Sequence, residues 1–434
     1  MSDLDRDALA AGMAQAWGEV SPKDMANSFA RPLYGTPGEW DLPQDVVPKK
    51  NLLYLAVGIP DSDSLPKEAL GESAARVISK PGDLALRYGF GQGPEGIRGW
   101  LAEQRTQAEN FAVTPEWFQM TNGSSGAIDL VVRSLIEPGD VIIAENPTYM
   151  GTLHNFRGVG ADIRYVPIDE EGLDTDALEN VLQELARQGK RVKLIYTISA
   201  FQNPSGVVLS AARRARLLEL AASHQVLVLD DEAYRELWFD EPPPRALSAM
   251  AEGWGVITVG SFSKTVATGI RVGFIHARPE LLALFGRMRF AMGQNQLGLR
   301  TFGDFLTSGA YPGHLKKVRE VYQRKRDLLH TAMQQAGLAR YLNWQPPGGG
   351  FYIWAELKEG LDREALWRTA IHEGIAVNNG RGFAPSYGQE DGQDDGQESR
   401  HIRIAYPWTP ESDFVEAAER LSAACARVEA GDIV

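Results

Sequence analysis

Short apolar, β-branched runs alternate with helical patterns through the middle of this chain, and this alternation restricts the fold more than any other feature. Such runs lie at residues 141–144, 193–197, 226–229 and 256–259. Amphipathic patterns at residues 175–188 and 211–223 predict helices between them. Buried strands that alternate with helices predict an α/β fold with a mostly parallel, doubly wound sheet. Ligands bind beyond the carboxyl ends of the strands in such sheets.

The two ends of the chain differ from this middle part. An amphipathic pattern at residues 314–335 and a glycine-rich, then strand-like stretch at 346–354 predict a smaller α+β domain near the C-terminus. The polar, acidic stretch at 387–399 predicts a surface loop. Residues at the N-terminus predict an amphipathic helix followed by a Pro- and Gly-rich arm. We therefore expect an arm or lid at 1–50, a large domain at 51–305 and a small C-terminal domain at 306–434.

Composition and charge exclude several classes of function. The 434 residues carry 44 Lys and Arg against 57 Asp and Glu, a net charge of −13, which disfavours nucleic acid as a partner. The single cysteine, Cys425, cannot form an internal disulfide, and no Cys/His cluster has the spacing of a metal site. The N-terminus lacks the features of a signal peptide, and no run reaches the roughly 18 apolar residues of a membrane span. We expect a cytoplasmic protein without a metal.

The segment after the last predicted strand carries a lysine between hydroxyl groups. Lys264 follows Ser261 and Ser263, and Arg271 lies shortly beyond. A lysine amine in a partly desolvated site can form an imine with an aldehyde. The two serines and the arginine would supply hydrogen bonds and positive charge to a phosphate. Lys264 alone is more typical of a surface lysine, so the other motifs decide between the two interpretations.

The string GSFSKTVATGIRVGF resembles the lysine segment of class I/II aminotransferases, the fold-type-I enzymes that depend on pyridoxal 5′-phosphate. The resemblance implies that Lys264 forms a Schiff base with this cofactor. It also implies that Ser261, Ser263 and Arg271 surround the cofactor phosphate. Similar motifs follow in the family's order from about residue 52 to 415.

The string DDEAY at residues 230–234 ends another predicted strand. A carboxylate against the pyridine nitrogen keeps that nitrogen protonated, which makes the ring an electron sink. The family's register implies that Asp231 has this role and that Tyr234 binds the ring hydroxyl. The two aspartates could otherwise cap a following helix. Their place on the strand before Lys264 favours the cofactor role.

Three more segments resemble the family's cofactor contacts. In QNPSG, the resemblance places Asn203 against the ring oxygen. In TNGSSG, which precedes a helical pattern, Ser124 and Ser125 would form the phosphate cup with the backbone N–H groups of a helix start. In ENPTY, Tyr149 would pack over the cofactor ring.

The substrate contacts are also implied by the resemblance. Gly58 lies in a segment similar to the family's substrate-contacting loop. Arg403, in a strand-like stretch, would hold the substrate α-carboxylate through the planar fork that lysine lacks. Tyr88 would reach the active site of a partner subunit, which implies a homodimer. Arg300 is a candidate only by position for binding a second carboxylate.

We expect an enzyme of amino acid metabolism or biosynthesis that forms a Cα carbanion. Transamination is the commonest outcome in the family that the chain resembles, so we expect an aminotransferase that converts an amino acid into a 2-oxoacid through pyridoxamine phosphate. The same residues serve β- or γ-elimination, replacement or ring closure, including chemistry on substrates like S-adenosylmethionine. Ser199 and Ala200 stand where the family commonly has Pro and Gly, which keeps this alternative open. A ligand sensor with an aminotransferase-like fold is a minor alternative, because the N-terminus is too short and too little basic for a DNA-binding domain.

Overall fold

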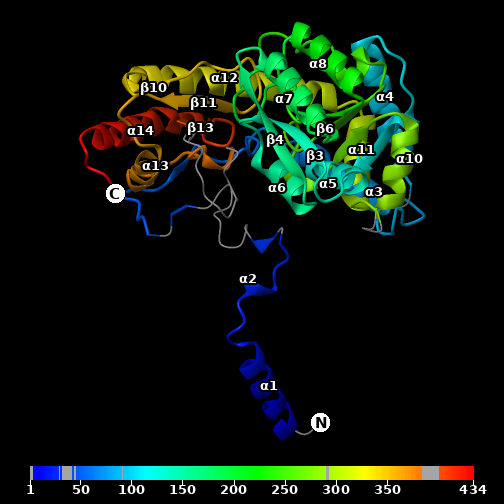
Figure 1. Cartoon of the computed structure of the whole chain (residues 1–434), viewed down its shortest axis with the longest axis horizontal. Helices are drawn as coiled ribbons and strands as arrows, with labels where there is room; N and C mark the ends of the chain where they lie inside the picture. Colours follow the sequence, from blue (N-terminus) through cyan, green and yellow to red (C-terminus); the bar gives the residue numbers. More distant parts are fainter. Residues whose placement is uncertain are drawn as a thin grey trace.

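The computed structural model of the chain describes residues 3–28, 30–31, 42–43, 45–89, 91–289, 293–383 and 400–434. An eight-stranded sheet forms its centre, in the order β2-β9-β8-β7-β6-β3-β4-β5 (Figure 1). The strands are β2 (Phe118–Thr121), β3 (Val141–Asn146), β4 (Asp162–Asp169), β5 (Gly172–Leu173), β6 (Val192–Thr197), β7 (Leu227–Asp231), β8 (Val256–Ser261) and β9 (Gly273–His276).

Most of this sheet is parallel, as predicted. Strands β4, β3, β6, β7 and β8 pair in parallel, whereas β9 and β5 run against their neighbours. The antiparallel β9 was not predicted, and its direction has a simple cause. A parallel connection needs a crossover of about a dozen residues or more, usually with a helix. The link between β8 and β9, residues 262–272, contains only the short 3₁₀ turn Thr268–Ile270, so the chain reverses.

Helices cover both faces of the sheet, which makes it doubly wound. Because side chains alternate along a strand, Ile142 packs with α5 (Gly123–Leu135), α6 (Met150–Gly158) and α10 (Pro279–Met288), whereas Ile143 faces α7 (Thr175–Arg187) and α8 (Ala211–His224). The predicted helices at 175–188 and 211–223 are confirmed to within a residue. Their starts are capped by the side chains of Asp174 and Ser210, which accept backbone N–H groups.

The C-terminal region, residues 311–434, contains a three-stranded antiparallel sheet in the order β10-β11-β13. Its buried side chains are continuous with those of the large sheet, including Phe118 in β2. The predicted domain boundary near residue 305 therefore stays a prediction. The elements are α12 (Tyr311–Gln335), β10 (Leu342–Asn343), β11 (Tyr352–Leu357), α13 (Arg363–His372), β12 (Ile375–Ala376), β13 (His401–Ala405) and α14 (Phe414–Glu429). Helices α3 (Lys67–Ser79), α4 (Glu95–Glu109), α9 (Leu247–Met250) and α11 (Gln296–Thr307) complete the body.

The segment at residues 53–61 belongs to the C-terminal region in space. Strand β1 (Leu53–Tyr54) pairs in parallel with β12, and the backbone N–H of Ala405 donates to Leu55 O at 2.6 Å. The buried Lys325 Nζ in α12 lies 2.5 Å from Asp61 Oδ1. A buried ion pair of this kind constrains geometry, because either charge left alone would be costly. The C-terminal region therefore holds the loop that contains Gly58.

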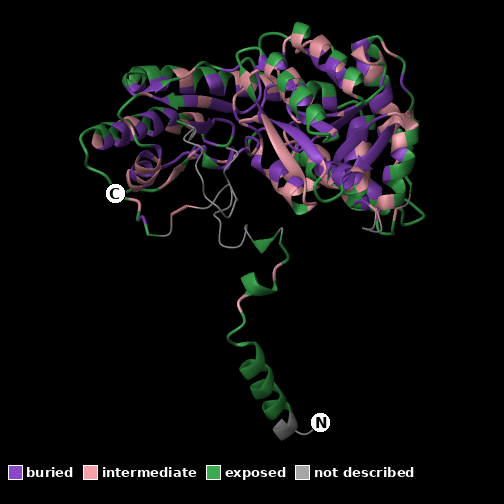
Figure 2. Ribbon diagram, in the orientation of Figure 1, coloured by how far each residue is buried: buried purple, intermediate pink, exposed green. Residues whose placement is uncertain are grey.

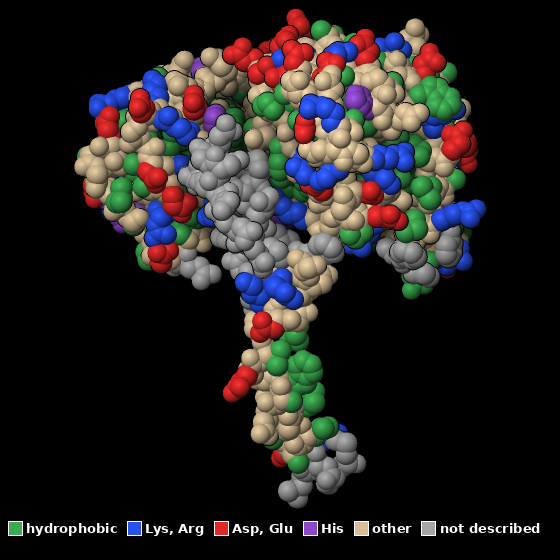
Figure 3. Space-filling model, viewed as in Figure 1, with side chains coloured by type: hydrophobic (Ala, Val, Ile, Leu, Met, Phe, Trp, Pro, Cys, Tyr) green, Lys and Arg blue, Asp and Glu red, His purple; other side chains and the backbone are tan. Residues whose placement is uncertain are grey.

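The N-terminal helix α1 (Asp3–Trp17), which confirms the predicted helix, and the short α2 (Pro22–Met25) lie apart from the body (Figure 1). The described side chains of α1 are exposed (Figure 2), among them Leu9, Met13 and Trp17. Hydrophobic side chains gather along one side of this helix in Figure 3. The predicted loop at 387–399 lies outside the described residues. Within the described part of the chain, every helix is too short or too polar for a bilayer crossing.

Candidate active site

A cavity of about 380 Å³ lies at the carboxyl ends of β6, β7 and β8. Its volume lies in the range of roughly 300–1,000 Å³ that is typical of small-molecule sites. The structure brings every predicted cofactor contact to its wall, namely Ser124, Ser125, Tyr149, Asn203, Asp231, Tyr234, Ser261, Ser263, Lys264 and Arg271. Gly58 and Tyr352 from outside the large sheet also line the cavity. The individual role of each residue stays a prediction.

One end of the cavity is rich in hydrogen-bond donors, and we call it the phosphate end: Ser124, Ser125, Ser261, Ser263 and Arg271. The first two lie in the opening turn of α5, where backbone N–H groups have no partner within the helix. Arg271 Nη1 lies 3.5 Å from Ser263 Oγ, and its Nη2 donates to Asn122 O at 3.4 Å. The Ser263 N–H donates to Ser261 Oγ at 3.1 Å. This arrangement suits a phosphate group.

Gly123 allows the helix start and the guanidinium to approach each other. Its φ of +77° lies in the left-handed region, and a Cβ there would lie 2.7 Å from Arg271 Nη2. Any other residue would be strained and would push the arginine away. The glycine of the TNGSSG motif therefore has a physical reason at this position.

Asp231 forms the deep wall of the cavity at the end of β7. It is buried, and its Oδ1 accepts the N–H of Ala233 at 3.1 Å. Its Oδ2 accepts the hydroxyl of Tyr196 at 3.2 Å, and that hydroxyl lies 3.0 Å from Thr152 Oγ1. Burial raises the pKa of Asp231 to about 6, against the opposing effect of these hydrogen bonds. A helix does not follow β7 directly, so the interpretation as a helix cap is wrong here.

Lys264 lies on the loop after β8, in the middle of the cavity. Its Nζ donates to Gly58 O at 2.7 Å and lies 5.9 Å from the ring centre of Tyr234 and 5.5 Å from that of Phe351. The surface interpretation of this lysine is wrong, because the side chain is half-buried and lines the cavity. An amine between aromatic rings is partly desolvated, as nucleophilic chemistry requires.

Gly58 and Tyr352 line another part of the cavity, and Arg403 lies behind it; we call these three residues the amino-acid end. Arg403 in β13 is fully buried, so a surface role is excluded. Its Nη1 donates to Asn203 Oδ1 at 3.0 Å and its Nη2 to Ala56 O at 3.1 Å. A guanidinium can only donate, so the amide oxygen of Asn203 faces Arg403 and its amide nitrogen remains available as a donor.

The ENPTY segment has a second role besides presenting Tyr149 to the cavity. Glu145 is buried at the end of β3 and accepts the hydroxyl of Thr197, the N–H of Ile198 at 3.2 Å and the amide of Gln202 at 3.1 Å. Burial raises the pKa of Glu145 to about 7. This carboxyl group therefore holds the segment that leads to Asn203.

Tyr88 is not brought to the cavity. It is 73% exposed and lies on a separate surface hollow together with Leu84, Leu86 and Arg300. Its predicted role in a partner subunit, and the role of Arg300, stay predictions.

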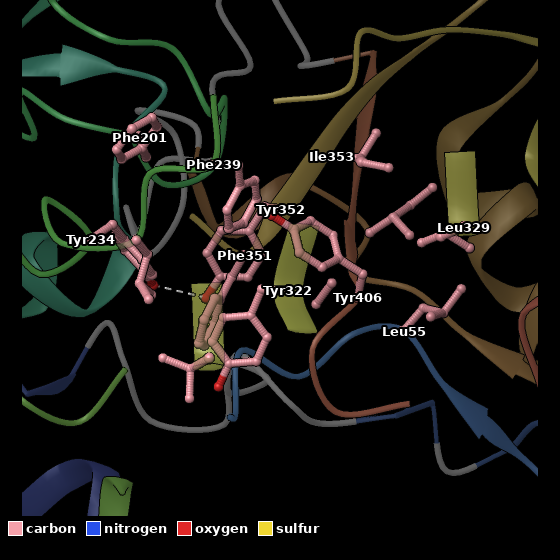
Figure 4. Close-up of a cluster of buried hydrophobic side chains, with 14 of the residues drawn as sticks. Leu55, Phe201, Tyr234, Phe239, Tyr322, Leu329, Phe351, Tyr352, Ile353 and Tyr406 are labelled. Carbon is pink, nitrogen blue, oxygen red and sulfur yellow. Dashed lines mark hydrogen bonds between the residues drawn. The ribbon is translucent and has the colours of Figure 1, made fainter. Parts of the chain in front are cut away.

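Three residues of the site were missed in the sequence: Tyr352, Glu145 and Tyr196. Tyr352 Oη lies 3.0 Å from Tyr234 Oη (Figure 4). The strand-like stretch at 346–354 was the only sign of it. Glu145 was part of a quoted motif, but its partners lie on another strand.

Pyridoxal 5′-phosphate fits these residues. The cationic phosphate end, the buried carboxyl group of Asp231 and the central amine of Lys264 match its phosphate, its ring nitrogen and its aldehyde. No group of metal-ligating side chains occurs in the described ranges. The doubly wound sheet and this site define the class of pyridoxal-phosphate-dependent transferases of fold type I.

Comparison with known proteins gives the family. Residues 50–421 match the model of aminotransferases of class I and II, and the chain belongs to this family. It is 32% identical over 382 residues to aromatic-amino-acid aminotransferase 1 of Thermococcus litoralis, covering 87% of this chain and 88% of that protein. It is also 32% identical over 381 residues to 2-aminoadipate transaminase of Thermus thermophilus, with coverage of 87% and 90%.

A solved structure supports the same conclusion. The α-aminoadipate aminotransferase LysN from Thermus thermophilus, complexed with N-(5′-phosphopyridoxyl)-L-leucine, superimposes with a TM-score of 0.79 at 32% identity. The match covers 88% of this chain and 94% of that one. The chain is thus a pyridoxal-phosphate-dependent aminotransferase, which confirms the predicted fold, cofactor and activity.

Proposed function

We propose that this aminotransferase moves the amino group of an α-amino acid to a 2-oxoacid with Lys264, Asp231 and Arg403 in the central roles. The observation that supports the proposal best is that Lys264 and Asp231, from separate elements, line one cavity together with the hydrogen-bond partner of Arg403. Arg403 reaches it through Asn203, which lines the cavity.

Lys264 would carry the proton transfers. The bound cofactor supplies an aldehyde that joins the substrate amine and a ring that withdraws electrons from the substrate Cα. Lys264 Nζ, released from that aldehyde, would take the proton from Cα and return it. Gly58 O accepts a hydrogen bond from Nζ and so orients it. Asp231 would place negative charge behind the ring nitrogen.

Arg403 would hold the substrate carboxylate. Its planar guanidinium donates to Asn203 Oδ1 and to Ala56 O, and its fork of N–H groups matches the geometry of a carboxylate. The rings of Tyr352 and Phe383 lie 4.2 Å and 4.8 Å from its centre and keep water away from it. A carboxylate bound in this setting gains more than it would in water.

The lining favours an amino acid with a long or aromatic side chain. Ile59, Ile198 and Tyr352 add apolar surface to the cavity. The relatives named for aromatic amino acids and 2-aminoadipate support such a substrate class.

We further propose that the enzyme acts as a homodimer. Leu84, Leu86 and Tyr88 are 53%, 63% and 73% exposed and share one surface hollow. Exposed apolar clusters are typical of protein interfaces. Sedimentation of the holoenzyme as a monomer at micromolar concentration would contradict this proposal.

The proposed function is tested by isotope transfer. The holoenzyme is mixed with ¹⁵N-labelled tyrosine, phenylalanine or 2-aminoadipate and with unlabelled 2-oxoglutarate, and the products are analysed by mass spectrometry. We expect ¹⁵N in glutamate and one 2-oxoacid formed per glutamate. Release of ¹⁵N-ammonia in its place would indicate elimination. Lys264→Ala, the control, is expected to lose turnover by at least about 10³-fold, since it removes the general base; full activity would refute its role.

A further inference from the structure

Two buried phenols form a pair inside the cavity. Tyr234 follows β7 of the large sheet, and Tyr352 begins β11 of the C-terminal region. Their hydroxyl oxygens lie 3.0 Å apart, as the dashed line in Figure 4 shows, and both residues line the cavity. The resemblance assigns Tyr234 to the cofactor ring oxygen, but the sequence assigned no role to Tyr352.

Tyr352 has little freedom to move. A Cβ on Gly58 would lie 1.9 Å from its hydroxyl oxygen, so that hydroxyl occupies the space beside a glycine. On its other side the ring lies 4.2 Å from the guanidinium of Arg403. The Tyr234 and Tyr352 rings meet edge to face, with centres 5.8 Å apart. The hydroxyl is therefore fixed against Tyr234.

The number of protons determines the direction of the pair. Burial raises the pKa of Tyr234 well above its usual value, so this phenol stays protonated. A phenol has one hydrogen to donate. If Tyr234 gives it to the cofactor ring oxygen, the bond between the two tyrosines must use the hydrogen of Tyr352. A hydroxyl that accepts a hydrogen bond becomes a stronger donor, because hydrogen bonds in a chain polarise one another.

We propose that Tyr352 is a positioning residue that donates to Tyr234 and thereby stabilises the ionised form of the cofactor ring oxygen. This inference rests on the proposed function, specifically on the contact of Tyr234 with that oxygen. Tyr352 acts through Tyr234. It would link the C-terminal region to the cofactor, as the bond from Arg403 to Asn203 also does. A more stable ring oxygenate holds the proton that it shares with the lysine–cofactor nitrogen less tightly. That proton is therefore lost at a lower pH.

The test is a pH titration of cofactor absorbance in the substrate-free holoenzyme. Tyr352→Phe keeps the ring and removes the hydroxyl. We expect its titration midpoint to rise by about half a pH unit, since chain polarisation strengthens a bond by only 10–30%. Tyr234→Phe removes the direct bond and should raise the midpoint more, by about one unit or more. In the Tyr234→Phe background, Tyr352→Phe should add no further shift.

Tyr406→Phe is the matched control. Tyr406 is buried in the same aromatic cluster and donates to Gly350 O at 2.7 Å, but it does not line the cavity. Its loss should lower the melting temperature without moving the titration. An unchanged midpoint in Tyr352→Phe, or an equal shift with and without Tyr234, would overturn the inference.

The cofactor dissociation constant gives a second reading. We expect it to increase by a few-fold in Tyr352→Phe and to stay unchanged in Tyr406→Phe. Neither measurement needs a substrate. A failed ¹⁵N transfer in the unmodified enzyme would therefore remove the proposed function without deciding the role of Tyr352, and the converse holds as well.

Discussion

The phosphate end of the cavity is assembled from a helix start and one strand-to-strand loop that pack on the same sheet, whereas the amino-acid end is assembled from three segments distant in sequence. At the phosphate end, backbone N–H groups, serines and Arg271 share the task. At the amino-acid end, Arg403 is fully buried and contributes charge from β13. At the phosphate end, the remaining donors can still bind the ligand when one donor is lost. At the amino-acid end, the loss of the single buried cation leaves no comparable donor among the residues we assign to that end. The two ends should therefore respond differently to mutation.

Among changes at the two ends, the largest effect is expected from Arg403→Ala. It removes the proposed carboxylate partner and leaves Asn203 Oδ1 without its donor. Loss of one partner of a buried charged pair costs about 2–5 kcal/mol, so kcat/KM should fall about 10²- to 10³-fold, mainly through KM. Steady-state kinetics with increasing amino acid measure this. Arg403→Lys, which keeps the charge but loses the fork, should recover only part of the activity; full recovery would show that the planar fork is not needed.

Arg271→Ala should have a smaller and different effect. The helix start and the serines remain, so we expect cofactor affinity to fall about 10- to 100-fold, the loss of one charge-assisted hydrogen bond. Activity should return when pyridoxal 5′-phosphate is in excess. Equilibrium dialysis of the cofactor and activity at saturating cofactor separate the two effects. Activity that stays low at saturation would mean that the phosphate end also positions the substrate, which would remove the contrast.

The smallest effect is expected from Asp231→Asn, and it concerns the stability of the apoprotein. The folded pKa of Asp231, about 6, lies above the unfolded value of 3.8. The unfolded chain therefore releases this proton first, and the folded apoprotein loses stability as pH rises from about 4 to about 6. The variant has no carboxyl group at this position and lacks this loss. The melting temperature of the variant minus that of the unmodified apoprotein should therefore increase by about 1–3 °C between pH 4 and pH 6 and stay constant above pH 6.

Scanning calorimetry of both apoproteins between pH 4 and 7.5 measures this difference. Glu145 titrates in both proteins, and most of its contribution cancels, because the charge of Asp231 is the smallest of the causes that shift the pKa of Glu145. A difference independent of pH would contradict the elevated pKa. The same substitution should lower the catalytic rate although it raises the melting temperature. The reason is that the carboxylate of Asp231, which lowers apoprotein stability, is proposed to face the cofactor ring nitrogen.

The contrast between the two ends also explains what could be predicted from the sequence. The phosphate end lies in short motifs, so Ser124, Ser263 and Arg271 could be placed from local patterns and family resemblance. Lys264 and Asp231 follow strands whose burial was visible as apolar runs. The antiparallel β9 was missed because strand direction depended on the length of a link and not on the composition of β9.

The amino-acid end resisted prediction because its contacts are not local. Nothing near Gly58 in the sequence indicates that the hydroxyl of Tyr352 occupies the space beside it. The partners of Glu145 lie on another strand and its following loop, so the local motif could not reveal that this carboxyl group holds the segment before Asn203. Tyr88 is 73% exposed on a hollow apart from the cavity, so its predicted role depends on a second subunit.

The attachment of residues 53–61 to the C-terminal region has a consequence for synthesis of the protein. Ala56 O binds Arg403, which lies 347 residues later in the chain, and Asp61 binds Lys325, which lies 264 residues later. A ribosome makes the phosphate end long before it makes β13, and contacts this distant in sequence form slowly. The nascent chain could therefore form its phosphate end before it can recognise an amino acid. We therefore expect pulse-labelled chains released before residue 400 to bind pyridoxal 5′-phosphate but to show no turnover of substrate.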